Sequence, residues 1–126
     1  MLQAWQQQAK VLGLETRVTF TGRQSRQEIS NWLQASQLFL LPSLYEGFPH
    51  VIAEAASVGL SSLVVNTTGS ADMPNVFPGL VTALPADDFQ AWKQAVQSQP
   101  FMRQTPIIHS PEQMMRAYID LLISSL

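Results

Sequence analysis

Apolar residues recur at spacings of three and four residues in five parts of the chain, which is the pattern of one face of an amphipathic helix. The first part covers residues 2–12 and is followed by Gly13, a residue that commonly ends helices. The second begins where Ser25 stands three residues before Glu28, the spacing of a capping box. The other helices are expected at 49–59, 87–100 and 110–122, counting the residues that start and stop each helix.

Short apolar and β-branched runs lie between these helices, at 17–21, 38–41, 62–65 and 80–83. The run at 38–41 contains only Leu and Phe, which suits a strand buried on both faces, as in a parallel sheet. Strands that alternate with helices of about ten residues indicate βαβ units. We therefore predict one α/β domain over residues 1–126, a doubly wound parallel sheet in which residues 73–79 form a loop.

The composition narrows the classes of protein that fit. Hydrophobic residues make up 46% of the 126 and charged residues 13%, which excludes a disordered, highly charged chain. The absence of cysteine excludes disulfide scaffolds, thiolate metal sites and cysteine nucleophiles. The net charge is −2 and the seven basic residues are scattered, so we expect no nucleic-acid partner. The sequence shows neither a membrane-spanning run nor a signal peptide, which predicts a cytoplasmic location.

Candidate chemistry lies in the loops after the strands, because ligands of open parallel sheets bind beyond the carboxyl ends of the strands. Three loops qualify, at 22–25, 42–49 and 66–72. The middle loop runs directly into a helix start, where unpaired backbone N–H groups and the helix dipole favour a phosphate. Gly47 would let a ligand approach the backbone of this loop closely. The third loop offers hydroxyl groups beside Gly69.

Two carboxylates accompany the middle loop. Glu46 lies within it, and Glu54 lies eight residues later among the apolar residues of the following helix. Burying an unpaired carboxylate is costly, so Glu54 requires a partner, and a ligand hydroxyl or a backbone N–H would serve. On spacing alone, a solvated helix face is the simpler interpretation of Glu54. His50 also has two interpretations: contact with a sugar or phosphate oxygen, or partial exposure at a helix start.

This region resembles a known family. Retaining glycosyltransferases of the GT-B fold carry a donor-binding segment in their C-terminal domain, and its counterpart here is Pro42-Ser43-x-x-Glu46-Gly47-Phe48-Pro49, followed by Glu54-Ala55 and Gly59. More narrowly, the string is similar to the large group 1 family (family 4), known for two glutamates separated by seven residues. Weaker likenesses at 18–22, 69–70 and 76–81 come in the family's order, so the resemblance covers roughly residues 2–98.

The resemblance implies a Rossmann-like domain that binds a nucleotide-sugar donor. The position matching Glu46 would contact the donor sugar as the catalytic residue, and the position matching Glu54 would hydrogen-bond the nucleotide ribose. The leaving diphosphate would assist the incoming acceptor hydroxyl, with retention of the anomeric configuration and without a protein nucleophile. No metal or other cofactor is implied. The residues expected to bind the donor are Gly22, Gly47, Phe48, Pro49, His50, Val51, Glu54, Gly69 and Ser70.

The sequence also departs from the family pattern. Family members have an N-terminal domain that binds the acceptor, and an Arg and a Lys that neutralise the donor diphosphate; we find neither here. Arg23 and Arg26 lie near a carboxyl-end loop, but exposed surface arginines are the simpler interpretation. We therefore expect a fragment of a GT-B C-terminal domain, truncated at its N-terminal side and inactive alone. Its saccharide or lipid-linked acceptor would bind to the missing domain.

Further expectations follow from the family's strand order, in which two earlier strands separate the run at 17–21 from the run at 38–41. Without those strands a sheet edge would stay exposed, and we expect it to pair with another copy of the chain. Two rival functions remain open: a nucleotide-sugar epimerase, which shares the fold, and a non-catalytic association domain. The family also implies polysaccharide assembly at the inner membrane face for the full-length protein.

Overall fold

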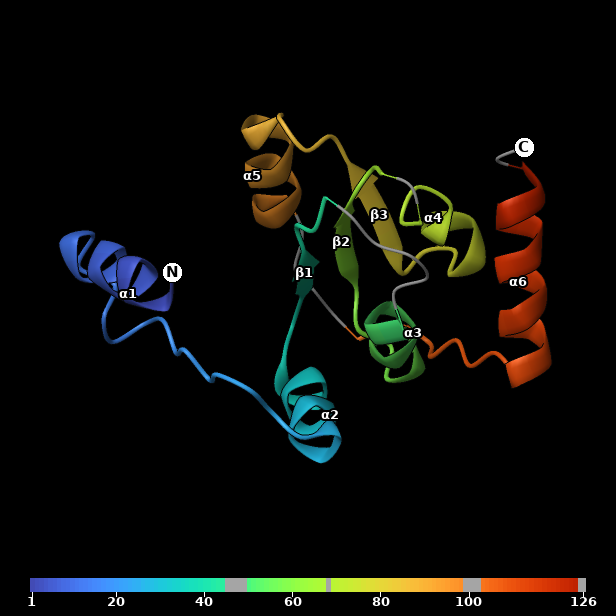
Figure 1. The fold of residues 1–126 in the computed structure, drawn as a ribbon, viewed down its shortest axis with the longest axis horizontal. Coiled ribbons are helices and arrows are strands. Elements are labelled where there is room, and N and C mark those ends of the chain that lie inside the picture. Colours follow the sequence, from blue (N-terminus) through green and yellow to red (C-terminus); the bar gives the residue numbers. More distant parts are fainter. Residues whose placement is uncertain (45–49, 68, 99–102, 125–126) are drawn as a thin grey trace.

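The protein is built on a small parallel sheet (Figure 1). A computed structural model describes residues 1–44, 50–67, 69–98 and 103–124. The sheet contains β1 (Phe39–Leu41), β2 (Ser62–Val65) and β3 (Val81–Leu84), in the order β1-β2-β3. In the register of the two parallel pairs, Leu40 lies beside Leu63, and Leu63 lies beside Thr82. Three of the four predicted strands are therefore confirmed, with β3 one residue later than expected.

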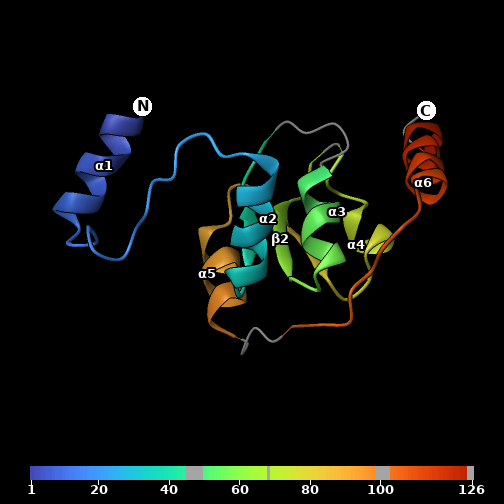
Figure 2. The same ribbon diagram turned by 90° about the horizontal axis from the view of Figure 1, so that it is seen from below.

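Helices lie on both sides of this sheet, as the doubly wound prediction requires. Figure 2 shows α3 (His50–Ser57) on one side of the sheet and α5 (Phe89–Gln97) on the other. α2 (Arg26–Ala35) contacts α3, and the short α4 (Met73–Val76) contacts β3. α1 (Leu2–Val11) and α6 (Pro111–Ser124) stand at opposite ends of the molecule (Figure 1). The α/β fold class is thus confirmed.

The hydrophobic core lies between α3, β2 and the segment around α4. Its buried members are Ile52, Ala56, Val64, Met73, Phe77, Leu80 and Val81. A second, smaller cluster joins α2 to α3 through Leu33, Ala55 and Leu60. All four residues of β2 are buried, because this strand is central and has helices on both of its faces. α3 is therefore held from two directions, by the sheet and by α2.

The capping box predicted for α2 is confirmed. The Ser25 hydroxyl accepts a hydrogen bond from the backbone N–H of Glu28 at 3.2 Å, and the Glu28 carboxylate accepts one from the Ser25 N–H at 2.7 Å. Ser25 acts on the Glu28 carboxylate through its backbone N–H first and its side chain second, and this holds the pKa of Glu28 below its ordinary value of 4.5, because hydrogen bonding to the carboxylate favours the charged form. The first turn of α2 is thus closed by its own side chains.

The starts of the last two helices are close to the predictions. Asp88, not Asp87, caps α5: its carboxylate accepts a hydrogen bond from the Ala91 N–H at 3.0 Å. At the start of α6, Ser110 and Gln113 exchange side-chain-to-backbone hydrogen bonds of 2.6 and 3.1 Å, the same reciprocal arrangement as in α2. In the part of the chain that the structure describes, no helix combines the length and apolar character that a membrane span requires.

α1 forms as predicted, but its apolar side is not covered. The helix ends in a Schellman motif, in which the Gly13 N–H bonds to the Lys10 carbonyl and the Leu14 N–H to the Ala9 carbonyl. Ala9 is the one buried residue of α1, whereas Trp5 is 56% exposed. Figure 1 shows α1 well apart from the sheet. The helix therefore forms as the apolar spacing predicts, but Trp5 belongs to neither core cluster of the described chain.

The predicted strand at 17–21 is wrong. The N–H groups of Arg17 and Val18 bond to the Leu14 carbonyl at 2.9 and 3.0 Å, in a turn that follows α1. Within the described ranges, the segment joins no strand of the sheet. β-branched and aromatic residues favour a strand only where neighbours provide a ladder and a surface to pack against, and this segment has neither.

Two other expectations need correction. The strand at 38–41 is not buried on both faces: Leu40 is 46% exposed, because β1 is an edge strand and only part of its outer surface is covered. Residues 73–79 are not simply a loop, because 73–76 form α4, with the N–H groups of Asn75 and Val76 bonded to the Asp72 carbonyl. Proline is compatible with this helix because it lies in the first turn.

Candidate functional site

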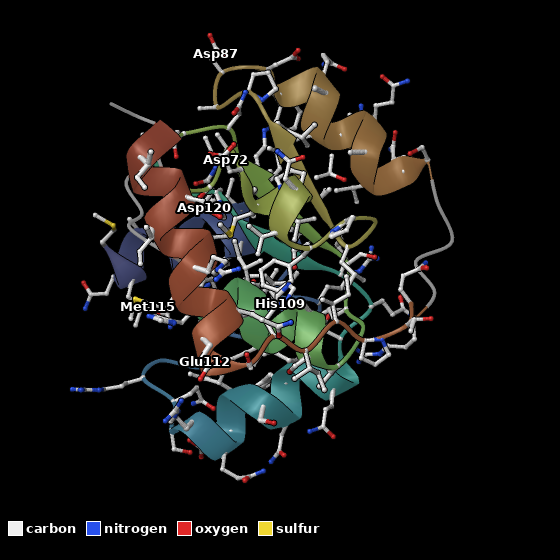
Figure 3. All side chains as sticks on the ribbon, turned by 90° about the vertical axis from the view of Figure 1, so that its right-hand side faces the viewer. Asp72, Asp87, His109, Glu112, Met115 and Asp120 are labelled. Atoms are coloured by element: carbon white, nitrogen blue, oxygen red, sulfur yellow. The ribbon has the colours of Figure 1, made fainter. Side chains whose placement is uncertain are left out.

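Three loops leave the sheet at one end, because all three strands are parallel. They begin at Pro42 after β1, Asn66 after β2 and Pro85 after β3, and we call their described residues (42–44, 66–67, 69–72 and 85–88) the carboxyl edge. Figure 3 shows Asp72 and Asp87, from the second and third loops, toward one end of the molecule, and His109 and Glu112 toward the other. Of the predicted site residues, Gly69 and Ser70 lie at the carboxyl edge.

Four of the predicted site residues, Glu46, Gly47, Phe48 and Pro49, lie outside the described residues. The described chain resumes with His50 and Val51 at the start of α3. His50 is exposed, and Val51 is half-buried and packs against the main core cluster. The sheet and core therefore fix the helix that follows the candidate donor segment.

Glu54 lies in the middle of α3 and is half-buried. Its neighbours Ile52 and Ala55 are fully buried. Its backbone carbonyl accepts a hydrogen bond from the Ser57 hydroxyl at 2.6 Å, but no group in the described ranges donates one to its carboxylate. Within the described ranges, the backbone N–H considered as a partner in the sequence analysis is thus not found, and a ligand hydroxyl as the partner stays a prediction.

The loop after β2 is compact and holds two buried hydroxyls. The N–H groups of Ser70 and Ala71 bond to the Thr67 carbonyl at 3.0 and 2.8 Å, and Gly69 has a φ of +88°, which favours glycine. Ser70 is 1% exposed. Within the described ranges, the side-chain oxygens of Thr67 and Ser70 are buried and have no hydrogen-bond partner. Such groups are normally paired, so these two are potential ligand contacts.

Gly22 is not brought to this loop. It is exposed, has a φ of +64° and lies in the segment that joins α1 to α2. The nearby Gln24 side chain bonds to the Thr21 carbonyl and to the Trp32 ring N–H, and within the described chain no hydrogen bond links this segment to the carboxyl edge. Of the predicted residues, the structure thus groups Val51 and Glu54 on α3, and Gly69 with Ser70 after β2.

An apolar groove that sequence reasoning missed opens between β1 and α5. Its volume is about 650 Å³, and its lining includes Leu40, Pro42, Val65, Phe89 and Trp92. The sequence predicted that the strand at 38–41 is buried on both faces, and periodicity alone cannot show which face stays uncovered. The groove reaches the carboxyl edge through Pro42 and Asp87.

Comparison with known proteins identifies the family to which the chain belongs. A family model described as glycosyl transferases group 1 matches residues 2–91, which is most of the chain. The chain therefore belongs to the group 1 glycosyl transferases. This confirms the coarser part of the resemblance noted in the sequence.

Individual relatives match shorter parts. The chain is 45% identical over 60 residues to a UDP-Gal:alpha-D-GlcNAc-diphosphoundecaprenol alpha-1,3-galactosyltransferase of Escherichia coli, over 47% of this chain and 16% of that protein. It is 37% identical over 67 residues to the Vi polysaccharide biosynthesis protein VipC/TviE of Salmonella typhi, over 53% of this chain and 11% of the relative.

A third relative is the 2-deoxystreptamine N-acetyl-D-glucosaminyltransferase of Niallia circulans, 37% identical over 71 residues, which are 56% of this chain and 18% of that protein. The matched part of the chain thus spans less than a fifth of the length of each of these three relatives. No solved structure matches the chain.

Proposed function

We propose that this chain is the donor-binding part of a retaining glycosyltransferase of family 4, an enzyme that moves a sugar from a nucleotide-sugar donor to an acceptor hydroxyl. Membership of the group 1 glycosyl transferases supports the class of reaction. Two relatives are named as transferases of galactose from UDP-Gal and of N-acetyl-D-glucosamine, which supports a sugar donor. The observation that carries the donor site is the pair of buried, unpartnered hydroxyls of Thr67 and Ser70 at the carboxyl edge.

The physical argument is one of hydrogen-bond satisfaction. A buried hydroxyl without a partner costs about 1–3 kcal/mol, and a ligand oxygen can supply the missing bond. Ser62 also has a buried, unpartnered hydroxyl, but it lies at the amino end of β2, between β1 and β3, where no loop follows a strand. Among the described residues, the hydroxyls of Thr67 and Ser70 are the ones that combine an unmet hydrogen bond with the end of the sheet where ligands bind.

The other predicted residues have the following roles in this proposal. The start of α3 offers N–H groups and a helix dipole to the donor diphosphate. Glu54 accepts a hydrogen bond from the ribose, which would give its half-buried carboxylate the partner that the described chain lacks. Glu46 contacts the donor sugar, the leaving diphosphate assists the acceptor hydroxyl, and no metal or cofactor takes part.

The acceptor and the turnover belong, in this proposal, to the whole enzyme. The matched part of the chain covers 11–18% of its three relatives, so we propose that donor binding here occurs without transfer. The names of two relatives, one concerned with an undecaprenol-linked sugar and one with the Vi polysaccharide, support a saccharide or lipid-linked acceptor in polysaccharide assembly. The inner membrane face is the location that we propose for the whole enzyme. An epimerase would need further acid and base groups that we do not find in the sequence.

The test is a nitrogen–proton NMR titration of the full 126-residue chain with UDP, GDP, ADP and their sugar conjugates. We expect shifts at the amides of residues 50–54 and 69–72, and the nucleotide that produces them identifies the base. Glu54→Gln should weaken binding without loss of spectral dispersion, since an amide cannot replace a charged acceptor. A well-dispersed spectrum that no nucleotide changes would contradict donor binding and favour the non-catalytic association domain.

We also propose that two copies of the chain associate through the outer edge of β1. In the described residues, β1 pairs with β2 alone, and Leu40 beside the apolar groove is 46% exposed. An exposed edge with apolar side chains favours pairing with another chain. Light scattering should therefore show a dimer, and Leu40→Lys should convert it to a monomer because a lysine in the groove opposes docking. A monomeric unsubstituted chain would contradict this proposal.

A further inference from the structure

One segment after α5 connects the ends of several helices. Residues 103–109, which we call the strap, run past the C-terminal ends of α2 and α3 before α6 begins (Figure 2). The N–H groups of Gln104 and Ile107 bond to the carbonyls of Gly59 and Ala56, both at 3.0 Å. At its far end, the His109 ring nitrogen Nε2 lies 2.8 Å from the Val76 carbonyl. The strap therefore ties α3 to the segment around α4.

Arg103 extends this connection to α2. One guanidinium nitrogen donates to the Val58 carbonyl at 3.1 Å, just after α3. The other donates to three carbonyls at the end of α2, at 2.8 Å to Leu33 and 3.0 Å to Ser36, and also to Gln34. The last carbonyls of a helix have no partner within it, and the negative end of the helix dipole lies there. One side chain thus bonds to the ends of two helices. Its partners at the end of α2 lie 67 to 70 residues earlier in the chain, and Val58 lies 45 residues earlier.

The chain around Gly59 is built to admit the strap. Gly59 has a φ of +71°, and its N–H and that of Leu60 close a Schellman motif on the carbonyls of Ala56 and Ala55. A Cβ at Gly59 would collide with the backbone carbonyl of Gln104. The strap therefore lies directly on the end of α3, with no space for a side chain between them.

The Arg103 side chain supplies a constraint that the apolar contact between α2 and α3 lacks. That contact consists of Leu33, Ala55 and Leu60, with Ile29, Phe39 and Val58 at its margin. Apolar contact is non-directional, so it holds two helices together without fixing how far one slides along the other. A planar guanidinium bonded to both ends does fix this, because its N–H groups have a rigid geometry.

We propose that Arg103 is a positioning residue for the donor site: it fixes α3 against α2, and through α3 it sets the place of Glu54 and of the helix start beside the donor segment. This inference rests on the proposed function for what the site binds. α3 has eight residues and contains no glycine or proline, so a shift at its end is transmitted to its start about 12 Å away. Arg103 lies beyond residues 2–91 matched by the family model, so family membership does not assign it this role.

The test compares Arg103→Met and Arg103→Lys with Arg116→Met, a matched loss of an exposed arginine on α6. Amide spectra of each folded chain are recorded without ligand and during titration with UDP and UDP-sugars. Arg103→Met should shift the amides of residues 50–54, which Arg103 does not touch, and weaken nucleotide binding about tenfold, because small misplacements of a site are costly. Arg103→Lys keeps a positive charge but only as a single point charge, so its amide shifts and its loss of binding should both be smaller than those of Arg103→Met. Arg116→Met should change neither the amide shifts nor the binding.

The outcomes separate the two proposals. If the unsubstituted chain binds no nucleotide, donor binding fails, and the ligand-free shifts at 50–54 alone decide the role of Arg103. If Arg103→Met does not fold, Arg103→Lys tests the positioning role instead. Small amide shifts at residues 50–54, together with weaker nucleotide binding, are then expected. Shifts confined to residues 33–36 and 58, or a lysine variant identical to the unsubstituted chain, would overturn the positioning role.

Discussion

The C-terminal end of α3 and the carboxyl edge differ in how completely the polar groups described there are paired. At the C-terminal end, the carbonyls of Ala55, Ala56, Val58 and Gly59 all accept hydrogen bonds, from the chain's own turn or from the strap. At the carboxyl edge, which lies beyond the other end, the hydroxyls of Thr67 and Ser70 have no partner. The Glu54 carboxylate, between the two ends, receives no hydrogen bond in the described ranges either.

We interpret this difference as one between a region that serves folding and the region proposed to bind the donor. Where every polar group is paired within the chain, substitution should affect folding and leave no role for a ligand. Where buried groups are left unpaired, the chain accepts a cost in stability that a ligand can reverse. The comparison therefore predicts that substitutions at the strap end change stability most, and that those at the carboxyl edge change binding most.

The largest effect is expected for Gly59→Ala at the strap end. The new Cβ would collide with the Gln104 carbonyl, and the φ of +71° is unfavourable for alanine, so we expect a loss of about 3 kcal/mol in the free energy of unfolding. Gly79→Ala is the matched control, since Gly79 has a φ of +78° but no atom near the added Cβ, and should cost only about 1 kcal/mol. Urea unfolding measures both, and equal losses would show that the strap does not press on Gly59.

A smaller effect, on binding alone, is expected for Ser70→Ala. Because the Ser70 hydroxyl has no partner, its removal should leave stability unchanged or raise it slightly, while nucleotide binding weakens about three- to tenfold. Ser62→Ala removes the other fully buried, unpartnered serine hydroxyl and should leave binding unchanged. Calorimetric titration with UDP-sugars checks the pair; equal binding by both variants would remove Ser70 from the site.

The smallest effect concerns the start of α2, which is already closed by its own side chains. Ser25→Ala should cost about 1 kcal/mol of stability without changing nucleotide binding. The pKa of Glu28 is lowered in the folded chain, so its contribution is fully present above its ordinary value of 4.5 and is lost as the pH falls through the lower folded value.

The stability difference between the unsubstituted chain and Glu28→Gln should therefore be constant from neutral pH down to the ordinary pKa of a glutamate, and should shrink below it. Thermal unfolding over this pH range is the measurement. A difference that grows with acidification would contradict the capping box as the origin of the pKa shift.

The candidate site could be predicted from the sequence only in part. The order of strands and helices placed the loops after β1 and β2 on one edge, and the structure has them there. That the hydroxyl of Ser70 is buried without a partner could not be predicted, because it depends on how the whole loop folds back on the Thr67 carbonyl. No local pattern pointed to Arg103, since its partners are 45 to 70 residues away.

α1 and α3 show what the sequence alone determined. Both were predicted from the same apolar spacing, and both end in a Schellman motif at a glycine with positive φ, Gly13 and Gly59. The capping box of α2 was likewise evident from residues three apart. These features form between residues within one or two helical turns, so the local sequence specifies them completely.

The tertiary structure alone decided which of these elements are covered. α3 buries Ile52, Ala55 and Ala56 because the sheet and α2 lie against it, whereas α1 buries only Ala9. Leu40 is half-exposed because no further strand pairs with β1 in the described chain. Residues 17–21 have β-forming side chains but form no strand, because they have no neighbouring strand. Burial and sheet pairing depend on segments far apart in the chain, and no local pattern encodes whether those segments are present.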